Sequence, residues 1–240
     1  MSLQNRTILI TGAARRLGRF FALTIAQAGG NIILHHGHSE KEAQNTAKEI
    51  EKLGVSCQII AADLSHTEQA IETIKDSLSG IELYGLVNSA AIFDPIKFVD
   101  TKLIDWQRHM DINLTMPFLL SQLVAKNVGE NEGKIVNILD WRALRPGHDH
   151  FPYTISKAAL VAMTKALAIA LAPNIQVNGL ALGAILPPAN GGNEDLVIKQ
   201  VPAARWANLD EVGQTLLFLL DGPAYITGEI IHIDGGRHLV

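Results

Sequence analysis

Short apolar segments alternate with helix-forming segments along most of this chain, and this alternation restricts its fold more than any other feature. The segments TILIT (7–11), NIILH (31–35), GLVNSA (85–90) and KIVNIL (134–139) are apolar at successive positions. Because successive side chains of a strand point to opposite faces, such strands need cover on both faces. The pattern therefore predicts an α/β fold of the Rossmann type, with helices on both sides of a parallel sheet.

Seven strands and six helices are expected. The predicted strands lie at 6–11, 31–35, 55–61, 84–88, 134–139, 175–180 and 229–233. The predicted helices lie at 15–29, 39–53, 65–79, 100–128, 152–172 and 208–220. A chain of 240 residues with this alternation fits a single domain, 1–240, built on a doubly wound parallel sheet.

The composition excludes several classes of protein. A net charge of −4 with both signs mixed along the chain gives no basic surface for nucleic acid. The single cysteine, Cys57, excludes an internal disulfide and fits a reducing compartment. The first residues lack the pattern of a secretion signal, and no uninterrupted apolar run reaches the roughly 18 residues of a membrane span. We therefore expect a cytoplasmic protein without a membrane segment.

A glycine-containing turn, GAARRLG, joins the first predicted strand to the first predicted helix. It contains Gly12 and Gly18, and Leu17 begins the helical spacing of apolar residues. Such a turn can offer backbone N–H groups and the positive end of a helix dipole to a pyrophosphate. The usual three-glycine dinucleotide pattern is incomplete, because Arg16 stands at its middle position. On these residues alone, an ordinary strand–helix turn is an equally good interpretation.

Tyr153 and Lys157 are four residues apart in a predicted helix, so their side chains lie on one face. A neighbouring ammonium favours the phenolate, so we expect the pKa of Tyr153 to be lowered and the pair to serve as an acid/base group. Asp140 lies thirteen residues upstream. The Tyr-x-x-x-Lys spacing also occurs by chance on many helices, so its meaning depends on the rest of the chain.

The glycine turn, Asn113, Tyr153 and Lys157 follow one another in an order that resembles the short-chain dehydrogenase/reductase family over essentially the full length. The segment IHIDGG (231–236) is similar to the last strand and turn of that family. The resemblance implies that Lys157 holds the nicotinamide ribose and that Asn113 interrupts its helix and holds a relay water. A buried asparagine at a helix kink is the alternative for Asn113.

Two further segments match the family in place. Asp63, in AADLS, resembles the acidic residue that contacts the adenine ring. Asn88, in LVNSAA, resembles the segment that supports the central strand and lines the cofactor. The resemblance therefore implies a dinucleotide along the carboxyl ends of the strands.

Three departures from the family pattern resemble pteridine reductases, and the terminal DGGRHL is also similar to dihydromonapterin reductases. Arg16 replaces a glycine, Asp140 replaces the catalytic serine, and Phe93 follows the NSAA segment. The resemblance implies that Arg16 and Phe93 hold the pterin ring. It also implies that Asp140 acts in catalysis with Tyr153 and Lys157.

The chemistry of Asp140 agrees with this resemblance. An ionised carboxylate only accepts hydrogen bonds, so it would repel the oxyanion that forms when a ketone is reduced. A pterin presents N–H and amino donors and is reduced at a C=N bond. We therefore expect reduction of a dihydropterin or dihydrofolate-like substrate. The alternatives are a ketone or 3-oxoacyl reductase and a non-catalytic NADP-binding sensor.

The end of the second predicted strand, LHHGHSEK, indicates NADPH. An NAD site usually carries an acidic residue there, whereas Glu40 comes late and belongs to the next helix. A 2′-phosphate would meet His36, His38, Ser39 and the helix N-terminus, with Arg15 nearby. The full set of predicted cofactor contacts is Gly12, Arg15, Arg16, Leu17, Gly18, His36, His38, Ser39, Asp63, Leu64, Asn88, Ser89, Ala90, Tyr153, Lys157 and Gly183.

The remaining expectations concern loops, metals and assembly. Segment 182–206 follows the sixth strand and is either a substrate-binding loop or a surface loop. The Leu182-Gly183 pair at its start departs from the Pro-Gly of the family.

Neighbouring histidines on a strand point to opposite faces, so we expect no metal site. His148 and His150 line the pocket mouth or are solvated. The family resemblance implies a homotetramer, or a homodimer, and helix 152–172 has a face of small residues that suits packing between subunits or within the core.

Overall fold

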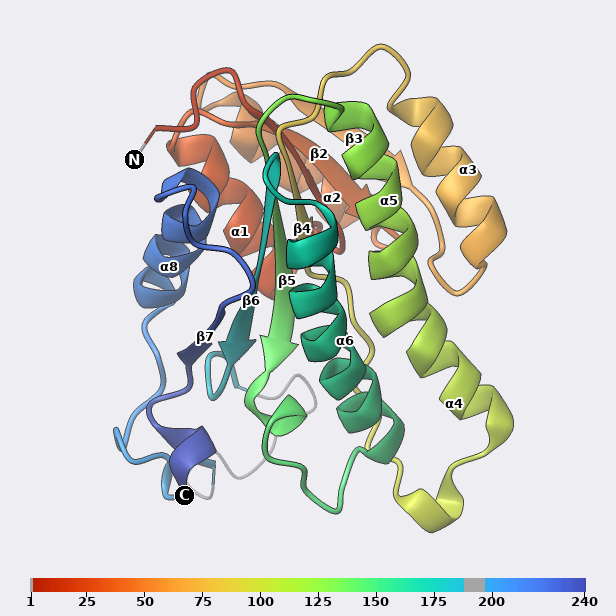
Figure 1. The fold of residues 1–240 in the computed structure, drawn as a ribbon, viewed down its shortest axis with the longest axis vertical. Coiled ribbons are helices and arrows are strands. Elements are labelled where there is room, and N and C mark those ends of the chain that lie inside the picture. Colours follow the sequence, from red (N-terminus) through yellow and green to blue (C-terminus); the bar gives the residue numbers. More distant parts are fainter. Residues whose placement is uncertain (1, 188–196) are drawn as a thin grey trace.

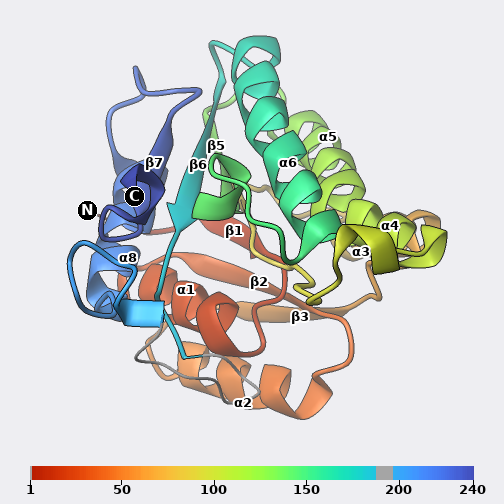
Figure 2. The same ribbon diagram turned by 90° about the horizontal axis from the view of Figure 1, so that it is seen from below.

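The computed structural model describes residues 2–187 and 197–240, and it contains a seven-stranded parallel sheet (Figures 1 and 2). The strand order is β3-β2-β1-β4-β5-β6-β7. The strands are β1 (Thr7–Ile10), β2 (Asn31–His36), β3 (Cys57–Ala61), β4 (Gly85–Asn88), β5 (Gly133–Asp140), β6 (Ile175–Leu182) and β7 (Ile230–Ile233). The order reverses between β1 and β4, so the predicted doubly wound sheet is confirmed.

Helices cover both faces of the sheet. The helices are α1 (Arg16–Gln27), α2 (Glu40–Glu51), α3 (Thr67–Ser77), α4 (Leu103–Met110), α5 (Met116–Val128), α6 (Phe151–Ala170) and α8 (Leu209–Asp221). Figure 2 separates α1, α2 and α8 on one side of the sheet from α5 and α6 on the other, and α3 packs against α5. Each βαβ connection therefore returns to a sheet that is buried on both faces.

The sequence of β1 shows why both faces are buried. Ile8 and Ile10 belong to the apolar cluster with α1 and α8, whereas Leu9 belongs to the cluster with α3 and α5. All three side chains are fully buried. Alternation within one uninterrupted apolar strand thus supplies residues to two cores at once.

The predicted helix 100–128 is interrupted and begins later than expected. A short 3₁₀ turn spans Phe98–Asp100, α4 begins at Leu103, and a π-helical turn, Asp111–Thr115, separates α4 from α5. Pro117 has no N–H to donate to the carbonyl of Asn113 four residues earlier, so regular helix bonding cannot continue there. The break that was expected at Asn113 is therefore present, and the single long helix is corrected to two.

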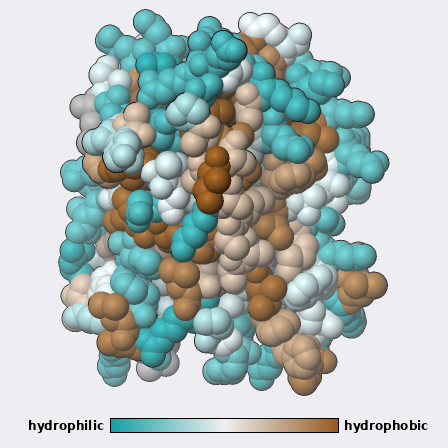
Figure 3. Space-filling model, in the orientation of Figure 1, coloured by the Kyte–Doolittle hydropathy of each residue, from teal (hydrophilic) through white to brown (hydrophobic). Residues whose placement is uncertain are grey.

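Helix α6 lies at the β5 and β6 end of its layer, on the far side of α5 from α3. By length and composition alone it meets the requirements for a membrane span, but its buried side chains pack against β5 and β6. Its small-residue face does not lie in the core, because Ala162 and Ala166 are exposed and Ala158 and Ala159 are only partly buried. The surface over α6 is largely apolar in Figure 3.

Candidate functional site at the carboxyl ends of the strands

The glycine turn is tightly packed against the strand beside it. Gly12 has φ +66°, and a Cβ atom there would lie 3.0 Å from the Cα of Ala90. A Cβ on Gly18 would overlap the carbonyl oxygen of Gly12. The hydroxyl of Thr11 accepts hydrogen bonds from the N–H groups of Ser89 and Ala90, each at 3.0 Å. Both glycines are thus needed for the close approach of strand, turn and helix that a dinucleotide turn requires.

The N-terminus of α1 fits an anion. Arg15 is extended and exposed, and among the residues that the structure describes no side chain caps this helix, whose first turn carries no acidic residue. Arg16 has φ +51° and is exposed, and its guanidinium donates to the carbonyl oxygen of Pro187 at 2.9 Å. The first N–H groups of α1, including that of Leu17, have no partner within the helix and lie at the positive end of its dipole.

The expected adenine contact lies in a polar cluster beyond β3. The Asp63 carboxylate accepts from the N–H of Ser65 at 2.9 Å and lies 3.1 Å from Nε2 of His38 and 3.6 Å from Nδ1 of His66. Burial raises the pKa of Asp63, but the bonds from Ser65 and the two histidines outweigh it, so the pKa is lowered. Leu64 is buried beside it.

The end of β2 carries the residues expected at the 2′-phosphate. His36 is buried, and its Nε2 atom lies 3.2 Å from the carboxylate of Glu40 in the first turn of α2. His38 is exposed, and Ser39 stands at the N-cap of α2. His36 and His38 therefore point to different partners. Within residues 2–187 and 197–240, no group of three or more potential metal ligands gathers.

Asn88 contributes a buried acceptor at the end of β4. Its amide nitrogen donates to Oδ1 of Asn137 at 2.8 Å, and Asn137 in turn donates to the hydroxyl of Thr164. The Oδ1 atom of Asn88 is buried and has no partner among the described residues. Such an acceptor suits a hydrogen-bond donor from a ligand at the strand ends.

Asp140, Tyr153 and Lys157 come together at the end of β5 and the start of α6. The Tyr153 hydroxyl donates to Oδ2 of Asp140 at 3.0 Å, and Oδ1 of Asp140 accepts from the N–H of Arg142 at 2.8 Å. The Lys157 ammonium donates to the carbonyl oxygen of Ile138 at 2.7 Å and lies 6.0 Å from the centre of the Tyr153 ring. All three predicted side chains therefore share one site.

The expected lowering of the Tyr153 pKa is wrong. Burial raises the pKa of Tyr153 well above its ordinary value, and the Asp140 carboxylate raises it further. Burial also raises the pKa of Asp140, although the Arg142 N–H and Tyr153 oppose this. Burial lowers the pKa of Lys157 to about 8, with Asp140 opposing. The site therefore holds a protonated phenol against a carboxylate that readily takes up a proton.

Asn113 ties the loop after β4 to α6. Its Oδ1 atom accepts from the N–H of Ile92 at 3.0 Å, and its amide nitrogen donates to the carbonyl oxygen of Ile92 at 3.1 Å and to Oγ of Ser156 at 3.0 Å. The side chain is fully buried, and its hydrogen-bond partners among the described residues are Ile92 and Ser156. This is the structural role offered as the alternative, and the relay water stays a prediction.

Phe93 lies beside Tyr153 and stacks on His150, which was expected either to line the pocket mouth or to be solvated. The Phe93 ring is 3.9 Å from the His150 ring at an interplanar angle of 8°, and it meets Tyr153 edge-on at 4.6 Å. His150 adopts φ +51°, and its Nδ1 atom lies 3.0 Å from the carboxylate of Asp149. Phe93 remains 47% exposed, so a flat ligand can reach it.

The turn after β6, uncertain from the sequence, is fixed by β7. The N–H of Gly183 donates to the carbonyl oxygen of Ile233 at 2.9 Å, and a Cβ atom on Gly183 would lie 2.6 Å from the Cα of Asp234.

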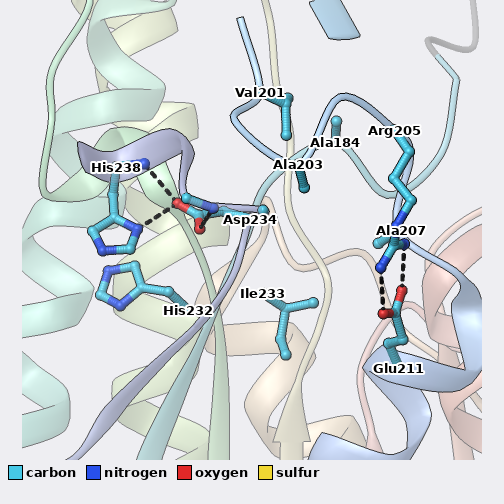
Figure 4. Close-up of a pocket in the computed structure, with 12 residues that line it drawn as sticks. Ala184, Val201, Ala203, Arg205, Ala207, Glu211, His232, Ile233, Asp234 and His238 are labelled. Atoms are coloured by element: carbon cyan, nitrogen blue, oxygen red, sulfur yellow. Dashed lines mark hydrogen bonds and ion pairs between the residues drawn. The ribbon is translucent and has the colours of Figure 1, made fainter. Parts of the chain in front are cut away.

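A pocket of about 340 Å³ lies next to this turn (Figure 4). In that view Asp234 bonds to His238, and Arg205 pairs with Glu211. Of the predicted segment 182–206, residues 188–196 lie outside the described residues.

Comparison with known proteins agrees with this geometry. A family model described as enoyl-(acyl carrier protein) reductase matches residues 12–238. The fold and site define a Rossmann-type oxidoreductase. The chain belongs to the short-chain dehydrogenase/reductase family.

Several relatives and solved structures are similar over nearly the whole chain. The 3-oxoacyl-[acyl-carrier-protein] reductase FabG of Aquifex aeolicus is 35% identical and the match covers 98% of each chain. Among solved structures, FolM alternative dihydrofolate reductase 1 from Brucella canis, complexed with NADP, is 32% identical, has a TM-score of 0.91 and covers 100% of this chain and 97% of that one. The corresponding Brucella suis protein with NADP is 32% identical with a TM-score of 0.92, covering 99% and 97%.

Proposed function

We propose that this protein is an NADPH-dependent reductase of a pterin, such as a dihydropterin or a dihydrofolate-like compound. The observation that carries the proposal is the hydrogen bond from Tyr153 to Asp140, where most of the family has a serine. A serine can donate to a substrate carbonyl, whereas Asp140 can accept from the N–H and amino groups of a pterin. The FolM structures support the same branch of the family.

Proton delivery follows from the pKa shifts at the site. NADPH, when bound, supplies a hydride to the carbon of the C=N bond. Tyr153 then gives its proton to the ring nitrogen and regains one from Asp140, whose raised pKa makes it a ready proton carrier. Lys157 stays largely protonated at neutral pH and stabilises negative charge on the phenol oxygen as the proton leaves.

The ring itself is held by Phe93 and Arg16. Phe93 offers an aromatic surface next to Tyr153, and stacking on such a ring contributes about 1 kcal/mol beyond burial. Arg16 is exposed at the first turn of α1, where its five donors can face a phosphate and the acceptor edge of the pterin together. Its bond to Pro187 places it beside the predicted substrate segment.

NADPH would lie along the carboxyl ends of the strands, and both similar FolM structures are complexes with NADP. The glycine turn and the start of α1 hold the pyrophosphate, and Asp63 with Leu64 lies at the adenine. Asn88, Ser89, Ala90 and Gly183 line the path to the nicotinamide, which Tyr153 and Lys157 hold. The end of β2 holds the 2′-phosphate through His36, His38 and Ser39, with Arg15 nearby.

A carbonyl reductase is the second candidate function, and the curated relatives favour it. The FabG protein of Aquifex aeolicus is similar over the same length at 35% identity. Asp140 argues against this function, because its carboxylate would repel the oxyanion formed from a ketone. A non-catalytic nucleotide sensor has no use for the assembled Asp140, Tyr153 and Lys157.

Assembly into a homotetramer, or a homodimer, is part of the proposal. The exposed alanines Ala162 and Ala166 allow close packing of α6 against another subunit. Light scattering after gel filtration measures the mass directly. A cytoplasmic location likewise remains a prediction from the sequence.

The experiment that tests the function is a substrate panel with NADPH and, separately, NADH. The rate of nicotinamide oxidation is measured with dihydrobiopterin, dihydromonapterin, dihydrofolate, 3-oxoacyl esters and simple ketones. Turnover of a pterin with NADPH is expected. Turnover of ketones or 3-oxoacyl esters alone would overturn the pterin assignment and establish the second candidate.

A further inference from the structure

His35 lies under the glycine turn and contacts it directly. It is 1% exposed, near the end of β2. Its Nδ1 atom accepts a hydrogen bond from the N–H of Gly12 at 3.2 Å, and its Nε2 atom lies 2.9 Å from the carbonyl oxygen of Ala62. The side chain thus joins the turn after β1 to the end of β3. His35 is not among the site residues predicted from the sequence.

The two contacts determine the state of the imidazole. The Ala62 carbonyl can only accept, so Nε2 carries the hydrogen and donates it. The Gly12 N–H can only donate, so Nδ1 presents a lone pair. Both bonds are satisfied by one neutral tautomer, whereas an imidazolium would point an N–H at the N–H of Gly12.

Other bonds fix the same turn from two sides. The N–H of Ala13 donates to the backbone carbonyl of His35 at 2.9 Å, and the hydroxyl of Thr46 donates to the carbonyl of Ala14 at 3.0 Å. The N–H groups of Gly12 and Ala13 and the carbonyl of Ala14 are therefore bonded within the protein. The N–H groups that follow, at the start of α1, are the ones left to face an anion.

We infer that His35, as its neutral Nε2–H tautomer, is a positioning residue for the dinucleotide: it holds Gly12 so that the turn and the start of α1 form the pyrophosphate site. This inference rests on the proposed use of NADPH. A side chain without an acceptor at the Nδ1 position leaves the Gly12 N–H buried and unsatisfied, so the turn is expected to shift.

The surroundings of His35 also favour the neutral form of its ring. Burial lowers the pKa of His35 to about 4, so the ring is neutral at physiological pH. The hydrogen bond that His35 donates to the Ala62 carbonyl and the charge of Asp63 favour protonation, while His36 opposes it. Ala62 and Asp63 follow β3, His36 is the next residue of β2, and burial outweighs the two groups that favour the cation.

The test compares two amide substitutions, His35→Asn and His35→Gln. Asparagine places an oxygen where Nδ1 stands and keeps an acceptor for Gly12. Glutamine reaches toward Ala62 but has no acceptor at that position. For each variant we would measure the Kd for NADPH by titration calorimetry, the KM for NADPH, kcat, and the free energy of unfolding.

The expected result is that His35→Gln raises the Kd and KM for NADPH by roughly tenfold, while kcat at saturating NADPH changes little. His35→Asn should restore affinity close to that of the wild type even if it is equally destabilised. A purely structural role would make affinity follow stability, whichever amide is present. Equal NADPH affinity in wild type and both variants, or affinity that follows stability, would overturn the inference alone. Failure of the wild type to bind NADPH would overturn the proposed function together with the inference.

Discussion

The two halves of the proposed active site are built in different ways. On the cofactor side, the turn at residues 11–14 is held by buried groups of neighbouring strands and helices, among them His35 and Thr46. On the substrate side, Phe93 and His150 stack on each other in loops, and Phe93 is 47% exposed. The difference indicates that the sheet fixes cofactor binding, whereas loop residues set substrate choice without a change in the fold.

Loss of the Asp140 carboxylate should reduce turnover of the pterin without weakening the binding of NADPH. In Asp140→Asn, kcat for the pterin is expected to fall by about a hundredfold or more, because the amide cannot carry the proton to Tyr153. The Kd for NADPH should stay within about twofold of the wild type. Asp149→Asn is the matched control, because Asp149 lies near Arg142 and His150 but has no bond to Tyr153. Equal kcat values in wild type and Asp140→Asn would refute the assigned role.

Acid should destabilise the protein on the cofactor side, through protonation of His35. The pKa of His35 is lower in the folded chain than in the unfolded chain, where it is near the ordinary histidine value of 6.5. Above pH 6.5 His35 is neutral in both states and does not reduce the free energy of unfolding. As the pH falls from 6.5 to about 4, only the unfolded chain takes up the proton, and the free energy of unfolding decreases by about 3 kcal/mol. Urea unfolding of wild type and His35→Asn at pH 7 and pH 4.5 measures this, since the variant should lose less. Equal losses in both proteins would contradict the shift.

Alkaline pH should affect the chemical step alone. The pKa of Lys157 is lowered to about 8, so its ammonium is lost above that pH and kcat should fall by up to tenfold per pH unit. The pKa of Lys157 is lower in the folded than in the unfolded chain, so the contribution of this group to the free energy of unfolding increases from about pH 8 upward. Unfolding therefore does not explain the fall in kcat. A pH profile of kcat at saturating NADPH checks this. A constant kcat through pH 9 would show that the ammonium is not required.

The smallest expected effect concerns the aromatic surface. Phe93→Ala should raise the KM for the pterin roughly fivefold through lost stacking, with an unchanged KM for NADPH. Phe98→Ala is a suitable control, since Phe98 is also exposed but contacts Phe151 instead of Tyr153. A higher KM for NADPH in Phe93→Ala would show that the two halves are coupled.

Much of the fold follows from the sequence, and part of the site does not. Strand β1 is a short apolar run and β5 carries apolar residues on both faces, so local pattern and burial agree. The interruption near Asn113 was expected at the right residue, but the extent of the π turn depends on Pro117 and on bonds to distant residues. The pKa of Tyr153 was predicted with the wrong sign, because the sequence shows the nearby lysine but not the burial or the direct bond to Asp140.

Other site residues could not be recognised because their partners are far apart in the chain. His35 contacts Gly12 across 23 residues, and its position at the end of a buried strand was the only local signal. The stacking of His150 on Phe93 depends on the left-handed backbone of His150, which no sequence pattern near it indicates.

The most direct test of the pterin assignment is a change of specificity at one position. We would measure kcat/KM for a dihydropterin and for a 3-oxoacyl ester in the wild type and in Asp140→Ser. The account predicts that the wild type prefers the pterin, and that serine, which can donate to a carbonyl, shifts the ratio toward the ester by at least about tenfold. A wild type that prefers the ester, or a ratio that Asp140→Ser leaves unchanged, would contradict it.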